Sequence, residues 1–157
     1  VYGMKERYFA LERGYNSRLD ELHAAILLTK LPHLEEYIAK RNEIAKYYER
    51  LLADTPLILP KTAAGNRHVY YIYVVRHPKR DWIISKLKER GIFVNVSYEW
   101  PIHTMDGYRY LGYQEGDFPH TEAACREIFS LPMYPALSFE NVGLVSDALH
   151  EILKNEK

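Results

Sequence analysis

Apolar positions in the first third of the chain recur with the period of an amphipathic helix. The first apolar stripe follows Ser17 and Asp20, which form a pair resembling a capping box, and it ends near Lys30 because Pro32 removes a backbone donor. The pattern therefore predicts a helix from Ser17 to Lys30. The stripe comprises Leu19, Leu22, Ala25, Ile26 and Leu28.

A second and longer stripe runs from His33 to Leu52, with charged residues between its apolar positions. Steps of three and four residues over this length predict a long amphipathic helix. Its apolar positions are Leu34, Tyr37, Ile38, Ile44, Ala45, Tyr48, Leu51 and Leu52.

Shorter elements follow, with the pattern expected of a strand, a helix and a second strand. Val69–Arg76 is dense in β-branched and aromatic residues, which predicts a strand covered on both faces. Arg80–Arg90 has a helical apolar face, and Gly91 is the expected left-handed residue at its end. Ile92–Tyr98 alternates in the way a second strand does.

The last third of the chain begins with a long stretch, Glu99–His120, that is rich in Pro, Gly and aromatic residues and has no period. A loop of this length in a small domain is usually functional or binds a neighbour. Thr121 is expected to cap a short helix through Phe129, and Ser130–Pro135 is expected to be extended. Ser138 is expected to cap a final helix.

These elements predict an α/β fold of α+β character, with two helices followed by a small sheet packed with helices. We expect residues 1–53 to be a helical segment continuing from a larger domain, and residues 68–157 to form a small α/β domain. Residues 54–67 contain two Pro, Gly65 and Asn66 without a sustained period, so they predict the connection between the two.

Composition narrows the function classes. The 157 residues are 47% hydrophobic, enough to bury a core, and 21 basic residues balance 21 acidic ones. This balance argues against nucleic-acid and membrane-surface partners. A single cysteine, Cys125, excludes an internal disulfide and suits a reducing compartment, so we expect a cytoplasmic protein. Because no spanning or signal segment is found and the first residue is Val1, we expect a soluble piece of a longer protein.

Two short segments carry candidate chemistry. Gly14–Arg18 places an amide, a hydroxyl and a guanidinium at a helix N-terminus, where an anion such as phosphate or carboxylate is favoured; an ordinary helix cap with a solvated arginine explains the same residues. His103 follows the second expected strand, where a loop can present a side chain for function; a structural or solvated histidine is the alternative. Asp106 lies nearby, but two candidate ligands make a weak metal site, so no metal is expected.

The ordered landmarks of the chain resemble the DegT/DnrJ/EryC1/StrS sugar aminotransferases. The run GYNSRLDELHAAILLTKLPHLEEYIAKRNEIAKYYERL resembles that family's segment, which begins Gly-x-Asn-x-Arg, continues with an Ala-Ala-Ile helix and ends in Arg and paired Tyr residues. Later landmarks follow in the family's order: His68-Val69-Tyr70, Val74-Val75-Arg76, Arg80-Asp81, Gly91-Ile92, Tyr98 to His103, Tyr110-Leu111-Gly112-Tyr113, Gly116-Asp117-Phe118-Pro119, Glu122 and Ser130-Leu131-Pro132. The resemblance covers nearly the whole chain.

This resemblance implies the C-terminal part of a fold-type I aminotransferase that uses pyridoxal 5'-phosphate and has active sites at a dimer interface. Asn16 would reach the cofactor phosphate of the neighbouring subunit. Arg18 would face the carboxylate of the amino donor or another anionic substrate group. His103 and Tyr98 would line the pocket for the donor or for a nucleotide-linked keto sugar. Such sugars feed lipopolysaccharide, other surface polysaccharides and glycosylated metabolites.

The family's chemistry also needs a lysine that forms a Schiff base and an acidic partner for the pyridine nitrogen. No lysine of the chain has the family's Ser-x-His-x-x-Lys context, so we expect no catalytic residue in this chain and no activity of the chain alone. The apolar stripe from Leu19 to Leu52 would lose its covering partners, which predicts a homodimer or higher homo-oligomer.

Two other function hypotheses remain open. The chain could be a noncatalytic dimerisation or binding module derived from this family, docking a partner through the Glu99–His120 loop. A regulatory DNA-binding role is the third hypothesis, and the neutral charge and absence of a basic helix argue against it.

Overall fold

The computed structural model describes residues 4–6, 9–11 and 19–155. The chain divides into two compact units, Val1–Glu36 and Tyr37–Lys157, which are described separately. The boundary between these two units lies inside the second expected helix, whereas the sequence predicted a connection at residues 54–67. The expected domain boundaries of the whole protein stay a prediction.

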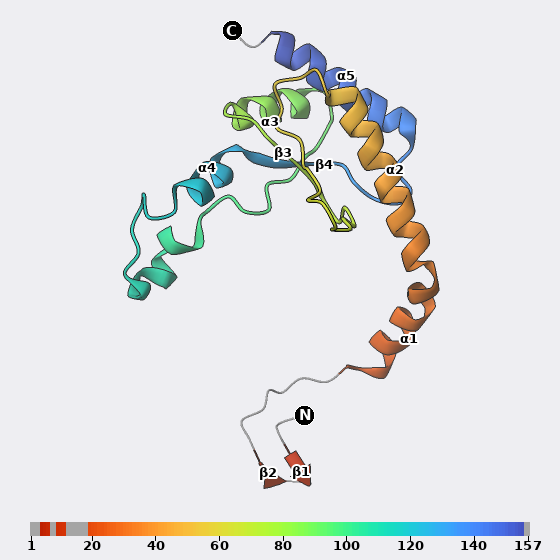
Figure 1. Ribbon diagram of the computed structural model, residues 1–157, viewed down its shortest axis with the longest axis vertical. Coiled ribbons are helices and arrows are strands. Elements are labelled where there is room, and N and C mark those ends of the chain that lie inside the picture. The colour runs from red at the N-terminus through yellow and green to blue at the C-terminus, as the bar shows by residue number, and fades with distance from the viewer. Residues whose placement is uncertain (1–3, 7–8, 12–18, 156–157) are drawn as a thin grey trace. The chain divides into compact units, whose positions relative to one another are not determined.

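The first unit contains a small hairpin and a helix (Figure 1). Strands β1 (Met4–Glu6) and β2 (Phe9–Ala10) pair antiparallel. Helix α1 (Glu21–Lys30) confirms the expected helix and its end, but it begins at Glu21 rather than near Ser17; the 3-10 turn η1 (Leu31–His33) follows at the expected Pro32. Asp20 is the N-cap of α1 without a side-chain hydrogen bond, whereas Ser17 lies outside the described residues. No residue of α1 is buried.

Helix α2 (Leu34–Leu52) is the long helix that the pattern predicted. Its buried residues all lie in its C-terminal half: Ile44, Ala45, Tyr48 and Leu52. Tyr48 is fully enclosed, stacks on Tyr73 with ring centroids 5.1 Å apart, and donates its hydroxyl to the Pro132 carbonyl at 3.1 Å. Burial raises the pKa of the Tyr48 phenol, so this hydroxyl stays a donor.

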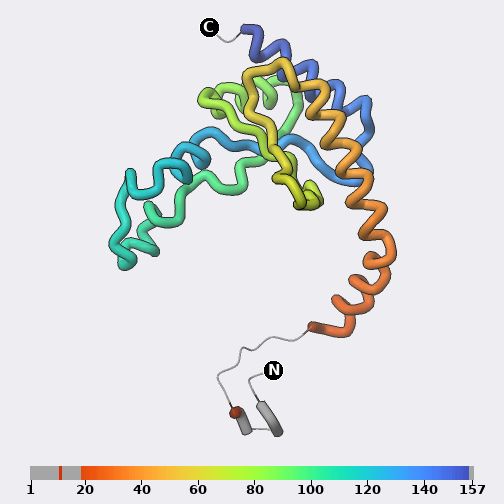
Figure 2. Tube along the Cα trace, viewed as in Figure 1, coloured from red at the N-terminus to blue at the C-terminus, as the bar shows by residue number. Residues whose placement is uncertain are grey.

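Strands β3 (Tyr73–Arg76) and β4 (Ile128–Leu131) form the sheet of the second unit, and their traces, yellow-green and blue, cross in the view of Figure 2. They pair antiparallel, with Tyr73 opposite Leu131 and Arg76 opposite Ile128. Isolated bridges extend the sheet on both edges, from Ile58 to Arg76 and from Asn95 to Ser130. The extended segment expected at residues 130–135 is thus confirmed at its start, but the strand begins two residues earlier.

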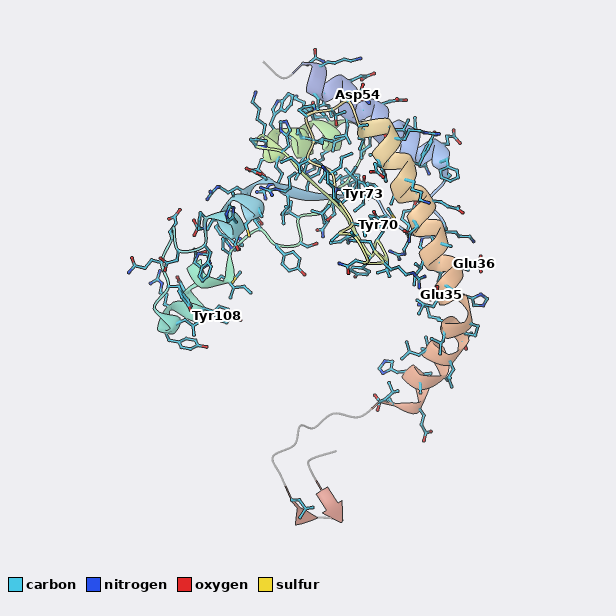
Figure 3. The ribbon with its side chains drawn as sticks, viewed as in Figure 1. Glu35, Glu36, Asp54, Tyr70, Tyr73 and Tyr108 are labelled. Atoms are coloured by element: carbon cyan, nitrogen blue, oxygen red, sulfur yellow. The ribbon has the colours of Figure 1, made fainter. Side chains whose placement is uncertain are left out.

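The strand expected from Val69 begins only at Tyr73, because the chain turns at Tyr70. This residue has a positive φ of 45°, and Arg41 of α2 donates to the carbonyls of Tyr70 and Tyr71 at 3.1 and 2.8 Å. Figure 3 shows Tyr70 and Tyr73 near each other at this turn, and their ring centroids are 6.0 Å apart. Hydrogen bonds from Arg41 of α2 therefore take the place of the strand-to-strand hydrogen bonds that were expected here.

The expected strand at Ile92–Tyr98 was wrong, because the segment does not form a hydrogen-bonded strand. The alternation of its side chains between the core and solvent was nevertheless predicted correctly. Only Asn95 pairs, donating to the Ser130 carbonyl at 3.4 Å and accepting from the Ser130 amide at 2.8 Å. Ile92, Val94 and Val96 nevertheless pack against the core while the residues between them are exposed. The segment is therefore an extended edge that bridges to the sheet at Asn95, while the Ile92 amide donates to the Leu87 carbonyl at 3.0 Å.

Helices α3 (Arg80–Glu89), α4 (Pro119–Glu127) and α5 (Phe139–Lys154) complete the second unit. Gly91 has the expected positive φ, 75°, after α3. Ser138 caps α5 as expected, accepting from the Asn141 amide at 3.2 Å. The expected cap at Thr121 was wrong: α4 already begins at Pro119, because proline at a helix's first position needs no partner for a backbone N–H.

The core lies where α2, α3 and α5 pack with the β3–β4 pair. Figure 1 shows α3 and α5 together beside the paired strands, with the C-terminal half of α2 against α5. The fully buried side chains at its centre include Tyr48, Tyr73, Phe129, Leu52, Ile83, Leu87, Leu149, Val75 and Val142. Among the described residues, no helix is long and apolar enough to cross a membrane.

Candidate functional site

A buried hydrogen-bonded pair, His103 and Glu122, connects the aromatic segment between residues 98 and 120 to the helix that follows it. His103 lies in the 3-10 turn η2 (Ile102–Thr104), and Glu122 lies in the first turn of α4. His103 Nε2 and Glu122 Oε1 are 3.0 Å apart, and their side chains are only 8% and 7% exposed. A second 3-10 helix, η3 (Asp106–Leu111), lies between them in sequence. The pair therefore fastens the start of the loop to the helix that follows it.

The same oxygen of Glu122 also accepts from the backbone amides of Gly116 and Phe118, at 2.8 and 3.3 Å. The Gly116 amide is the largest cause that lowers the pKa of Glu122, and His103 and the Phe118 amide lower it further, against the opposing effect of burial. The carboxyl is therefore an ionised acceptor at neutral pH.

Helix α4 is held on the sheet by charged contacts that fix the position of Glu122. Arg76 of β3 binds the Glu127 carboxylate at 2.8 Å, and the His77 amide donates to the Glu127 carbonyl at 3.0 Å. Arg80, buried at the start of α3, donates to the Cys125 carbonyl. These contacts hold α4, the helix that carries the Glu122 carboxylate.

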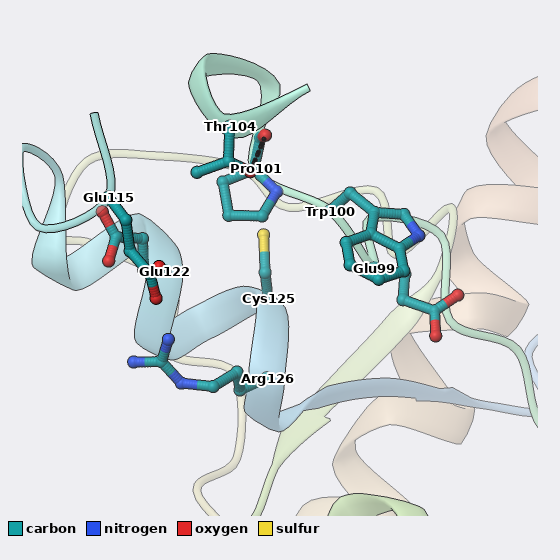
Figure 4. Close-up of a pocket in the computed structure, with 8 residues that line it drawn as sticks. All are labelled: Glu99, Trp100, Pro101, Thr104, Glu115, Glu122, Cys125 and Arg126. Carbon is teal, nitrogen blue, oxygen red and sulfur yellow. Dashed lines mark hydrogen bonds between the residues drawn. The ribbon is translucent and has the colours of Figure 1, made fainter. Parts of the chain in front are cut away.

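A cavity of about 360 Å³ lies beside Glu122. In Figure 4 Glu115 and Glu122 stand on one side, Trp100 and Glu99 on the other, and the Cys125 thiol lies between them. The lining residues are Glu99, Trp100, Pro101, Thr104, Glu115, Glu122, Cys125 and Arg126. The three carboxylates can accept hydrogen bonds from hydroxyl or amino groups, the Arg126 guanidinium can donate hydrogen bonds, and the Trp100 indole face can stack on a flat ring.

His103 lines a second cavity, of about 310 Å³, with a mostly apolar wall. Its ring meets the Phe118 ring edge-on, with centroids 4.8 Å apart, and Phe118 in turn meets Tyr113 at 5.1 Å. Ile102, Leu111 and Thr121 complete the lining. Each member of the His103–Glu122 pair therefore borders a different cavity.

The structure brings only part of the expected site into view. His103 is buried and paired, while Tyr98 is 68% exposed on the strand-like segment before the loop. Asn16 and Arg18 lie outside the described residues. The roles expected for these four residues in binding stay predictions.

The expected absence of a Schiff-base lysine stays a prediction for this chain. The lysines with described side chains are all exposed or half-exposed, and Lys86 is paired with Glu89 at 2.8 Å. A Schiff-base lysine needs an enclosed setting that keeps its amine neutral. Among the described residues there is also no group of three or more side chains able to hold a metal ion.

Residues that the sequence did not single out for chemistry contribute most of the polar wall. Glu122 was noted only as a landmark, and Trp100, Glu115 and Arg126 were not assigned any role. Pro119 followed three residues later by Glu122 signals a carboxylate in the first turn of a helix, but this spacing does not say what that carboxylate binds.

Comparison with known proteins identifies similar chains. The model of the DegT/DnrJ/EryC1/StrS aminotransferase family matches residues 1–150. A dTDP-3-amino-3,4,6-trideoxy-alpha-D-glucose transaminase of Micromonospora megalomicea subsp. nigra is 47% identical over 97% of this chain and 42% of its own length. A protein of Geobacillus stearothermophilus named pleiotropic regulatory protein is 40% identical over 99% of this chain and 42% of its own length.

A solved structure shares the fold. The crystal structure of S. venezuelae DesV in complex with a ketimine intermediate superposes with a TM-score of 0.94 and 34% identity, covering 99% of this chain and 42% of that one. The chain thus spans about 42% of the length of these relatives.

Proposed function

This chain belongs to the DegT/DnrJ/EryC1/StrS aminotransferase family, and from that premise we propose that it is the C-terminal part of an enzyme that transfers an amino group from an amino acid to a keto group of a nucleotide-linked sugar. The observation that carries the proposal is 47% identity to a dTDP-sugar transaminase across 97% of the chain. The product would be an amino sugar for a polysaccharide or a glycosylated metabolite.

The proposed cofactor is pyridoxal 5'-phosphate, which supplies an electron sink for transamination when bound. We propose that the described residues do not hold it by themselves, and the exposed or half-exposed positions of their lysines support this. We propose that the rest of the whole enzyme supplies the lysine and the acidic partner. Asn16 would donate to the cofactor phosphate from the neighbouring subunit. The chain alone would then be inactive.

The proposed substrate contacts come from two parts of the chain. Arg18 would bind an anionic group of the donor or the sugar nucleotide through its guanidinium. His103 and Tyr98 would line the sugar or donor pocket, and the rigid pairing of His103 with Glu122 at 3.0 Å supports its use as a fixed hydrogen-bonding group. Tyr98, being exposed, is available to a ligand or a neighbouring subunit.

We also propose a homodimer as the working unit. Helix α1 supports this, since none of its residues is buried although Leu22, Ile26, Leu27 and Leu28 are apolar. Contact with a second copy or with the rest of the enzyme would remove this surface from water. Light scattering of the full-length protein measures the state directly, and a monomer would contradict the proposal.

An amino-transfer assay tests the enzyme proposal. The full-length protein containing this chain is incubated with glutamate or glutamine and a panel of dTDP- and UDP-linked keto sugars, and amino sugars are detected by mass spectrometry. We expect an amino sugar together with the visible absorbance of a bound pyridoxal Schiff base. The 157-residue chain alone is the matched control and is expected to give neither. Absence of both signals from the full-length protein would overturn the proposal.

The regulatory name of the Geobacillus relative favours a second candidate, a noncatalytic dimerisation or binding module. Balanced charge, with 21 basic and 21 acidic residues, does not support DNA as the partner. The same assay separates the candidates, because a noncatalytic module would dimerise or bind a protein partner without producing an amino sugar.

A further inference from the structure

One carboxylate oxygen receives three hydrogen bonds in the buried pair. Glu122 Oε1 lies 2.8 Å from the Gly116 amide, 3.3 Å from the Phe118 amide and 3.0 Å from His103 Nε2. The two amides belong to the loop that leads into α4, and the histidine belongs to the turn at the loop's other end. A single oxygen thus joins both ends of residues 103–118.

The chemistry of this oxygen determines the state of the histidine ring. Two backbone amides can only donate, so they favour the ionised carboxylate, which can only accept. The nitrogen of His103 that faces the carboxylate must then carry a hydrogen. In the neutral ring this leaves Nδ1 as the acceptor, because one nitrogen of neutral imidazole donates and the other accepts.

Packing opposes a flip of the His103 ring, which would put a carbon atom in the place of Nε2. His103 is 8% exposed, and the edge of its ring meets Phe118, whose own amide is held by Glu122. A ring flip would break the contact with Oε1 and leave a charged carboxylate with one partner fewer in a buried place.

We propose that Glu122 is a positioning residue that keeps His103 in the form with hydrogen on Nε2, so that Nδ1 is the ring nitrogen able to accept a hydrogen bond from a hydroxyl or ammonium group of the substrate. The part that concerns substrate rests on the proposed function. The ring form itself does not, since it follows from the contacts within residues 103–122.

The ring form can be measured without any activity. Nitrogen-15 labelling of histidine in the full-length protein, read at a pH where the ring is neutral, distinguishes the two forms by the chemical shifts of the ring nitrogens. The His103→Gln variant identifies the signal of His103 by its disappearance. We expect the hydrogen on Nε2 in the unmodified protein, and a hydrogen on Nδ1 would overturn the proposal.

Two variants of Glu122 then separate positioning from simple folding. Glu122→Gln keeps an oxygen that can accept from the same three donors, so we expect the ring form and kcat/KM to stay within about threefold of the unmodified protein. Glu122→Ala removes the acceptor, so we expect a mixture of ring forms and a kcat/KM lower by about tenfold or more. Glu140→Ala, which removes an exposed carboxylate on α5, is the matched control and is expected to change neither.

The results of the ring-form measurement can be told apart from those of the amino-transfer assay. An unchanged ring form in a folded Glu122→Ala protein would overturn the positioning role even if amino transfer is observed. Conversely, the expected ring forms in a protein without amino transfer would support the role of Glu122 and contradict the proposed function. Should Glu122→Ala fail to fold, a hydrogen on Nδ1 in the unmodified protein would still overturn the proposal.

Discussion

Helices α1 and α5 are both rich in apolar residues, yet they differ completely in burial. Of the 16 residues of α5, seven are buried, and the helix is tied to its neighbours by Arg90 donating to the Ala148 carbonyl at 2.9 Å and by His150 contacting the Leu51 carbonyl at 2.8 Å. None of the 10 residues of α1 is buried.

The distribution of apolar residues explains the difference. In α5 they recur on one face, so one layer of neighbours covers them, whereas in α1 the consecutive Ile26, Leu27 and Leu28 point in several directions and are all exposed. Apolar content therefore identifies a helix but does not locate its partner. The partner of α5 lies within the chain; a partner for α1 is not found among the described residues.

The largest expected difference between the helices comes from removing one leucine from each. Leu149→Ala should lower the free energy of unfolding by about 2–5 kcal/mol, because a fully buried side chain leaves a cavity. Leu28→Ala, at a position 68% exposed, should change it by less than about 0.5 kcal/mol. Denaturant unfolding of the chain measures both, and equal losses would remove the contrast.

Charged substitutions on α1 test whether its exposed apolar surface forms an interface with a second copy of the protein. If the proposed homodimer uses α1, Leu22→Asp combined with Leu28→Asp should raise its dissociation constant by about tenfold or more, because burying a charged group at an interface costs free energy. Leu144→Asp, at an exposed position of α5, should leave it unchanged. Sedimentation or light scattering over a concentration series is the measurement. Unchanged association of the double variant would mean that α1 does not contribute to the interface.

Replacing the N-cap residue of each helix should reveal a smaller difference in stability between α5 and α1. Ser138→Ala should destabilise the chain by about 1 kcal/mol, since Ser138 accepts from the Asn141 amide. Asp20→Ala should have an effect of only a few tenths of a kcal/mol, because the Asp20 side chain makes no capping hydrogen bond. Thermal unfolding compares them, and a larger effect at Asp20 would contradict the assignment of caps.

The contacts of Glu122 in α4 should add a modest dependence of stability on pH. The pKa of Glu122 is held below its ordinary value of 4.5, so its stabilising contribution is full at neutral pH and is lost as the pH falls through the lowered pKa of the folded protein. Unfolding midpoints measured from neutral to acidic pH should therefore fall less steeply in Glu122→Gln. Identical slopes for the two proteins would contradict a lowered pKa.

The sequence predicted the helices well because their signals are local. Periodicity located α2 and α5, and the conformational preferences of Ser138 and Gly91 located two of the helix ends. The expected strands were less accurate. The turn at Tyr70 depends on hydrogen bonds from Arg41, 29 residues earlier, and no local pattern contains that contact.

The candidate site was predicted only in part for a similar reason. His103 was singled out because its residue type and loop position are visible in the sequence, but its contact with Glu122 spans 19 residues of irregular loop. Trp100 and Arg126 come together at one cavity only when η2 and α4 pack against each other. Their residue types alone suggest solvated positions as readily as a binding wall.

The sequence by itself determined the family of this protein and its helices, because these depend on residues close together in the chain or on an ordered series of motifs. Only the tertiary structure decided that β3 pairs with β4, that Ile92–Tyr98 bridges to the sheet at Asn95, and that one oxygen of Glu122 joins His103 to two backbone amides. These contacts join distant segments, and packing selects them from many alternatives that the local sequence permits equally.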